Sequence, residues 1–162
     1  MSRLTTITLA KEYQKFSAAH FTIFSATERE RLHGHNFRVE AAITVPVGED
    51  GLCFSYRLYK DILKQVCEEL DEYVLLPADS PHLKISENDD FYIASFNGES
   101  MPFLKSDTRV LPIRNSTVEE FAHYILQKLL ANNNQGERID IQALEVRVYS
   151  GPGQSGSSCW TA

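Results

Sequence analysis

Four stretches of the chain have the residue pattern of β-strands. They run from about Thr5 to Phe16, from about His35 to Val47, from about Gln142 to Tyr149 and from Ser157 to Thr161. The pattern is clearest in the third stretch, where apolar residues alternate with charged ones, as in a strand with one buried face. A cluster of glycine and acidic residues follows the second stretch and predicts a turn.

Two other segments follow the helical period. The first runs from about Tyr56 to Tyr73, with an apolar stripe on one side and charged residues on the other. The second opens at Ser116, which we expect to be the N-cap, with Glu119 three residues later completing a capping box. Asparagines and a glycine over residues 132–136 are expected to end this helix.

The segment between the two helices is less regular. Residues 91–96 and 101–104 flank Asn97-Gly98, a dipeptide favoured in tight hairpin turns because both central residues need a positive φ. We therefore expect an inserted β-hairpin within residues 73–114. The predicted order is two strands, a helix, the hairpin, a helix and two strands, and residues 1–162 are expected to form a single domain of the α+β class.

Composition narrows the functional classes. The 162 residues carry a formal net charge of −6 and contain no basic run, which argues against a nucleic-acid-binding protein. No apolar stretch approaches the length of a membrane span, and the N-terminus has no signal-peptide pattern, so we expect no membrane partner and a cytoplasmic location. Three widely spaced cysteines are consistent with free thiols in a reducing compartment.

The strongest chemical signal is a pair of histidines separated by one residue. His33 and His35 stand at the start of a predicted strand, where residues two apart point to the same face, so both imidazoles can reach one ion. His20 closes another strand-like stretch and supplies a third imidazole. Three histidines with no nearby cysteine and one open position are typical of a catalytic zinc site. The alternative is a pair of surface histidines in a turn.

The chain resembles the family of 6-pyruvoyltetrahydropterin and 6-carboxytetrahydropterin synthases. Residues 16–21, Phe-Ser-Ala-Ala-His-Phe, resemble the family's N-terminal zinc motif, and residues 32–37, Leu-His-Gly-His-Asn-Phe, resemble its paired-histidine motif. Leu70-Asp71 and residues 115–119 are similar to the segments that end the first helix and open the second. The resemblance covers nearly the whole chain, in order.

This resemblance implies a tunnelling fold, in which a four-stranded antiparallel sheet carries two helices on one face. It implies a homo-oligomer, a trimer or hexamer with active sites between subunits. It also implies a zinc-dependent lyase with His20, His33 and His35 as metal ligands and a small pterin-like substrate, 7,8-dihydroneopterin triphosphate or a relative. The reaction then removes either triphosphate or the side chain as an aldehyde.

The catalytic base is expected to be Glu30. Many family members carry a cysteine shortly before the paired histidines, whereas one branch carries a glutamate three residues before the first of them, and Glu30 occupies that position. A carboxylate beside zinc can abstract a proton if partial burial raises its pKa. The alternative is that Glu28 and Glu30 are loop charges paired with Arg29 and Arg31.

Two departures from the family pattern concern the catalytic relay and the pterin anchor. The family's Asp-His relay reads Asp71-Glu72, so Asp71 is retained as a catalytic candidate while His82 or His123 would have to replace the histidine. The glutamate that anchors the pterin in many members is replaced by Ser150. The resemblance also implies that Thr117 and Glu119 contact the substrate.

These departures leave three possibilities open. The chain is either a lyase of this family, or a non-catalytic, zinc-containing oligomeric protein that binds a ligand, or else an enzyme acting on a non-pterin substrate.

Overall fold

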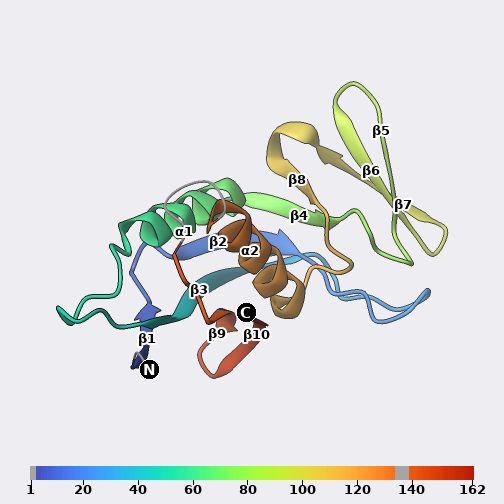
Figure 1. Ribbon diagram of the computed structural model, residues 1–162. Coiled ribbons are helices and arrows are strands. Elements are labelled where there is room, and N and C mark those ends of the chain that lie inside the picture. The colour runs from blue at the N-terminus through green and yellow to red at the C-terminus, as the bar shows by residue number, and fades with distance from the viewer. Residues whose placement is uncertain (1–2, 134–138) are drawn as a thin grey trace.

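The computed structural model describes residues 3–133 and 139–162. Two helices lie over one large sheet, and a smaller sheet extends beyond its end (Figure 1). In chain order the elements are β1 (Leu4–Leu9), β2 (Lys15–His20), β3 (His33–Pro46), α1 (Arg57–Leu70), β4 (Tyr73–Pro77), β5 (Lys84–Glu87), β6 (Phe91–Phe96), β7 (Glu99–Leu104), a 3-10 turn (Lys105–Asp107), β8 (Thr108–Leu111), α2 (Val118–Asn133), β9 (Ala143–Gly151) and β10 (Gln154–Thr161). The predicted end of the second helix lies partly outside these residues.

The first predicted strand is in fact two strands. β1 pairs with the far end of β3, whereas β2 pairs with its beginning. The chain turns between them at Lys11 to Gln14, where the Gln14 backbone N–H donates to the Lys11 carbonyl at 2.9 Å. Gln14 is fully buried, and its own carbonyl accepts a hydrogen bond from the Val39 N–H at 2.8 Å. The single-strand prediction was wrong because this polar side chain closes the turn inside the protein.

The main sheet is larger than the predicted four-stranded antiparallel sheet, and it is mixed. Its strand order is β10-β9-β3-β2-β4-β8, and β1 also pairs with β3. The pairings among β1, β2, β3, β9 and β10 are antiparallel, as expected, but β4 joins β2 in parallel and β8 joins β4 in parallel. The prediction failed because the two ends of the inserted segment add strands to the sheet.

Both helices cover the same face of the main sheet and enclose its core. Apolar residues of β3 alternate inward from Phe37 to Val45, and they pack with the buried stripes of α1 and α2. On the opposite face of the sheet the side chains are polar: the Tyr149 hydroxyl donates to Glu40 at 3.0 Å, and Arg38 lies over the Tyr149 ring. Within the described residues, neither helix combines the length and the apolar character needed to cross a bilayer.

The N-terminus of α2 is capped one residue later than predicted. The Ser116 hydroxyl donates to the Leu75 carbonyl at 2.8 Å, so it does not cap the helix. Instead the Thr117 hydroxyl accepts the Glu120 N–H at 3.4 Å, and the Glu120 carboxylate accepts the Arg114 N–H at 2.7 Å. The capping-box prediction for Ser116 and Glu119 was wrong because Ser116 is committed to the neighbouring strand β4.

The inserted segment forms a second sheet, which we call the extension (β5, β6 and β7). The predicted hairpin is present: β6 and β7 are joined at Asn97 and Gly98, whose φ angles are 47° and 79°. The extension has its own apolar cluster, separate from the main core. The buried members of this cluster are Phe21, Ile23, Leu76, Leu83, Ala94 and Phe96.

Candidate metal centre

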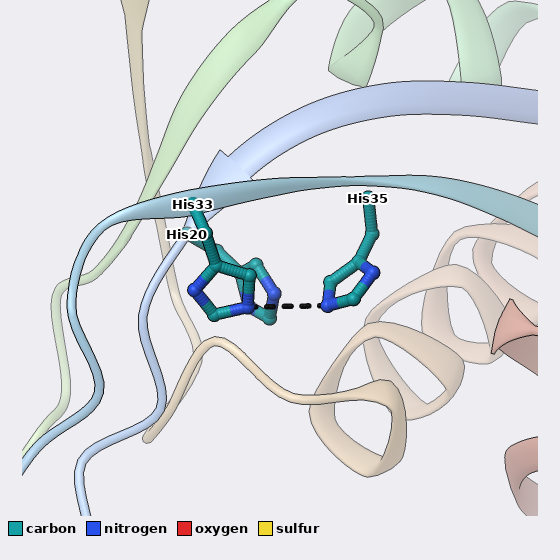
Figure 2. Close-up of side chains that lie close together, drawn as sticks. All are labelled: His20, His33 and His35. Atoms are coloured by element: carbon teal, nitrogen blue, oxygen red, sulfur yellow. Dashed lines mark hydrogen bonds between the residues drawn. The ribbon is translucent and has the colours of Figure 1, made fainter.

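Two neighbouring strands bring the three histidines together. In the antiparallel pairing of β2 and β3, His20 lies directly opposite His33, and Ala18 lies opposite His35. Opposite residues of such a pair share a face, and residues two apart along a strand also share one. All three rings therefore point to the helix-covered face, as Figure 2 shows. One nitrogen from each ring lies within 4.8 Å of the others.

In His20 and His33, a hydrogen bond at Nδ1 leaves the other ring nitrogen, Nε2, able to bind an ion. His20 Nδ1 lies 2.7 Å from the Ser116 carbonyl oxygen, and His33 Nδ1 lies 2.7 Å from the Arg31 carbonyl oxygen. Since a carbonyl only accepts, both Nδ1 atoms carry the proton and both Nε2 atoms keep a lone pair. This is how hydrogen bonds outside a metal site orient its histidine ligands.

The distances suit a tetrahedral metal ion. His33 Nε2 and His35 Nε2 are 3.1 Å apart. Two nitrogens that each lie about 2.0–2.1 Å from a tetrahedral zinc ion are separated by about 3.4 Å. A small outward movement of the rings is therefore enough to admit the ion.

His20 gives an independent test of this fit. Its Nε2 is buried and has no hydrogen-bond partner among the described residues. An unpartnered buried nitrogen is costly unless something binds it. Burial lowers the pKa of His20 below its usual value, against the opposing effect of the hydrogen bond to Ser116. The neutral imidazole, which is the form that ligates metal, is thus favoured, and the three residues fit a metal ion.

Glu30 lies at the edge of this cluster. Its carboxylate Oε2 accepts the Thr22 N–H at 2.9 Å and is 3.9 Å from His33 Nε2. Burial favours a higher pKa, but the hydrogen bonds from Thr22 and the nearby histidines outweigh it, so the pKa of Glu30 falls below its usual value. The condition named for the base, a pKa raised by partial burial, is therefore not met, because the hydrogen bonds from Thr22 oppose the effect of burial. The carboxylate faces His33 rather than an arginine.

The sequence reasoning missed the residue that clamps the Glu30 loop, Asn115. The Asn115 side chain accepts the Ile23 N–H at 3.1 Å and donates to the Ile23 carbonyl at 2.8 Å. The next residue along the chain, Ser116, provides the carbonyl that orients His20. Residues 115 and 116 therefore support both the candidate base and a candidate ligand. In the sequence, residues 115–119 carry two signals, a capping pattern and a similarity to the family segment that opens the second helix, and neither indicates a contact with the Glu30 loop.

The structure does not bring Asp71 to the histidines within one chain. Asp71 follows α1, and its Oδ1 accepts the backbone N–H of Ser17 at 2.7 Å. Glu72 adopts a positive φ of 64° and donates its N–H to the Ser17 carbonyl at 2.7 Å. Asp71 and Glu72 stand where the family has its Asp-His relay. Both are hydrogen-bonded to Ser17 of β2, three positions before His20.

The remaining candidates lie around the start of α2 and on the surface. Thr117 caps α2. Glu119 is exposed and does not form the predicted capping box, because the Ser116 hydroxyl donates to the Leu75 carbonyl instead. His82 is exposed, and His123 is exposed on α2 with its Nδ1 3.4 Å from the Ser158 hydroxyl. Ser150 is half-buried near the end of β9.

The fold and the cluster together define a class of protein, an α+β chain whose sheet presents three histidines able to hold a metal ion. Comparison with known proteins identifies the family. The 6-pyruvoyl tetrahydropterin synthase family pattern matches residues 8–158, and the chain belongs to this family.

Individual relatives are similar over most of their length. The crystal structure of 6-pyruvoyl tetrahydropterin synthase from Plasmodium vivax is 27% identical, covers 99% of both chains and superposes with a TM-score of 0.91. A variant of that enzyme, in which a catalytic glutamate is replaced by alanine, is 26% identical with a TM-score of 0.90 and the same 99% coverage. A protein of Methanocaldococcus jannaschii, provisionally named 6-carboxy-5,6,7,8-tetrahydropterin synthase, is 25% identical over 141 residues, 86% of each chain.

Proposed function

We propose that the protein is a zinc-dependent lyase that acts on 7,8-dihydroneopterin triphosphate or a close relative. The observation that carries the proposal is the convergence of His20, His33 and His35 on one point, with a buried nitrogen among them that has no hydrogen-bond partner in the described parts of the chain. Membership of the 6-pyruvoyl tetrahydropterin synthase family supports the pterin substrate. When bound, zinc would supply Lewis-acid polarisation of a substrate oxygen.

Glu30 is our candidate for the catalytic base. Among the described residues, it is the carboxylate that lies within ion-pair distance of one of the three histidines, with Oε2 3.9 Å from His33 Nε2. A glutamate of ordinary pKa is already ionised near neutral pH, and the lowered pKa of Glu30 leaves it so; it can therefore accept a proton, although as a weaker base than a glutamate whose pKa is raised. The relative from P. vivax has a glutamate among its catalytic residues, which supports this role.

The other assignments involve the start of α2 and a second copy of the chain. Glu119, exposed at the first turn of α2, is our candidate for a contact to the pterin, and Thr117 for a neighbouring contact beside its capping bond. We also assign Asp71 to catalysis. Because Asp71 is not among the described residues that converge on the metal centre of its own chain, we propose that it acts in an active site completed by a neighbouring subunit.

We therefore propose a homo-oligomer, a trimer or a hexamer. Membership of the 6-pyruvoyl tetrahydropterin synthase family supports this proposal. The face of the main sheet away from the helices is polar, with Arg147 2.6 Å from Glu145 as well as the Glu40 and Tyr149 contact, so we expect joining at the sheet edges rather than face-to-face packing there. Light scattering coupled to size-exclusion chromatography measures the mass directly. A monomer at all concentrations would contradict the proposal.

The decisive experiment follows products by mass spectrometry after zinc-loaded protein is incubated with 7,8-dihydroneopterin triphosphate. Replacement of Glu30 by Gln should lower kcat by roughly 10²- to 10⁴-fold, the usual contribution of a general base, while bound zinc is retained. Glu28→Gln is the matched control, since Glu28 is exposed in the same loop and its side chain makes no recorded polar contact to the described residues. We expect Glu28→Gln to keep wild-type turnover.

Metal analysis tests the ligand assignment separately. Removing one of the three ligands, as in His35→Ala, should weaken zinc binding by at least the roughly 10- to 100-fold that loss of a residue supporting a ligand costs. A full equivalent of zinc retained after all three replacements would refute the assignment. The products decide between loss of triphosphate and release of the side chain as an aldehyde. Pterin binding without turnover would instead support a non-catalytic ligand-binding protein, and neither binding nor turnover would indicate a non-pterin substrate.

A further inference from the structure

Arg29, next to the candidate base, lies between the Glu30 loop and the extension. Its guanidinium carbon is 5.1 Å from the centre of the Phe21 ring and 5.7 Å from the centre of the Phe96 ring. Phe21 directly follows the candidate ligand His20, whereas Phe96 is the last residue of β6. Both rings belong to the apolar cluster of the extension and are buried. The arginine thus bridges the active-site loop and the small sheet.

The same guanidinium also holds the main chain of Glu30. Arg29 Nη1 donates to the Glu30 carbonyl at 2.9 Å. The Glu30 N–H donates to the Thr22 carbonyl at 2.8 Å, and its carboxylate accepts the Thr22 N–H at 2.9 Å. The N–H, the carbonyl and the carboxylate of Glu30 are therefore all hydrogen-bonded. Thr22 binds the N–H and the carboxylate, and Arg29 binds the carbonyl.

We propose that Arg29 is a positioning residue, which fixes Glu30 against the extension so that its carboxylate faces the metal centre. This role rests on the function proposed above. In this proposal, the extension supports the Glu30 loop. Arginine suits the position because its planar group can contact aromatic faces while its N–H groups donate sideways, which lysine does less well.

The ion pair to the extension is a minor part of this contact. Arg29 Nη2 is 3.7 Å from Glu99 Oε2, and the Glu99 side chain is 75% exposed while that of Arg29 is 20% exposed. Exposed pairs at such distances contribute little. The rings and the Glu30 carbonyl are therefore the contacts that matter, and Glu99→Gln should change turnover less than twofold.

Arg29→Met is the main test, because methionine keeps an apolar stem between the rings and removes the donor. We expect kcat to fall roughly tenfold to hundredfold, the effect of losing one charge-assisted hydrogen bond, with KM and bound zinc close to wild type. Amide hydrogen exchange at Thr22 and Glu30 should accelerate by a similar factor. Arg29→Lys should recover part of both effects.

Lys105→Met is the matched control. Lys105 follows β7, and its Nζ lies 5.5 Å from the centre of the Tyr92 ring and 2.9 Å from Glu87 Oε2, so within the described part of the chain its side chain has the same kinds of contact in the extension but no polar contact with the loop. It should leave kcat and loop exchange unchanged. Wild-type exchange and kcat in Arg29→Met, or equal effects of the two variants, would overturn the proposal.

The exchange measurement also separates this proposal from the proposed function. If the wild-type protein turns over no pterin, faster exchange confined to residues 22–30 in Arg29→Met still supports the positioning role, and unchanged exchange still rejects it. If Arg29→Met does not fold, Arg29→Lys is measured in its place. Wild-type loop exchange and kcat in Arg29→Lys would then contradict the proposal that the planar guanidinium group positions the loop.

Discussion

The main sheet and the extension support the candidate site in different ways. The three histidines stand on paired strands of the main sheet, where the register of β2 and β3 sets their positions. Glu30 stands on the loop between those strands, which has only a few backbone hydrogen bonds of its own, such as that from the Glu30 N–H to the Thr22 carbonyl, and is held to its surroundings by side chains, Asn115 on one side and Arg29 with the extension on the other. The ligands are thus placed by a backbone ladder, and the base by a few individual contacts.

This difference has a physical consequence. A strand register is cooperative, because a slip by one residue would turn every side chain to the opposite face and expose the core. A loop held by side chains can move locally without disturbing the rest of the fold. Metal binding and base positioning are therefore expected to respond to different mutations.

The largest contrast is expected between two buried phenylalanines, one in each region. Phe121 of α2 is fully buried, with its ring centre 5.2 Å from that of Phe37 and 6.3 Å from that of His20. Phe121→Ala should lower the free energy of unfolding by about 3–5 kcal/mol and weaken zinc binding, because the cavity lies beneath the histidines. Phe96→Ala should leave zinc bound and loosen mainly the extension and the Glu30 loop.

Denaturant unfolding, zinc analysis and hydrogen exchange on both phenylalanine variants provide the measurement. Equal loss of zinc in the two variants would show that the regions are not separable. The comparison would also fail if Phe96→Ala accelerated exchange throughout β2 and β3.

A smaller effect is expected at the clamp on the Glu30 loop. Asn115→Ala leaves the half-buried N–H and carbonyl of Ile23 without their partner, which should cost about 1–3 kcal/mol and slow turnover while zinc remains bound. Asn132→Ala is the control, since Asn132 makes one side-chain bond to the Lys128 carbonyl on α2. Measuring kcat and bound zinc in both variants tests this prediction. Loss of zinc in Asn115→Ala would show that Asn115 supports the metal ligands and not only the Glu30 loop.

The smallest effect is expected where β10 meets the start of α2. A Cβ on Gly156 would lie 3.0 Å from Val118 Cγ2 and 3.1 Å from the Glu119 N, so Gly156→Ala must displace the first turn of α2 slightly. We expect a cost of about 1 kcal/mol and a higher KM through Glu119, with zinc binding unaffected. Gly151→Ala, whose Cβ would meet nothing within 4 Å, is the control. Equal KM values for the two variants would argue against a substrate contact at Glu119.

Much of the fold could be predicted because its signals are local. The Asn97-Gly98 turn was confirmed, as were the positions of both helices to within a few residues. The division of the first strand at Gln14 and the parallel strands β4 and β8 could not be predicted. They depend on a buried side chain and on pairings between distant segments, which leave no periodic pattern in the sequence.

The sequence by itself determined that His33 and His35 share a face, because alternation along an extended chain is a property of the local backbone. Only the tertiary structure decided that His20 lies opposite His33, beside the pair, and that the carbonyl of residue 116, 96 positions away, orients its ring. The contact of Arg29 with Phe96 has the same origin. Such contacts join segments that are far apart in the chain, so only the packed fold brings them within reach of one another.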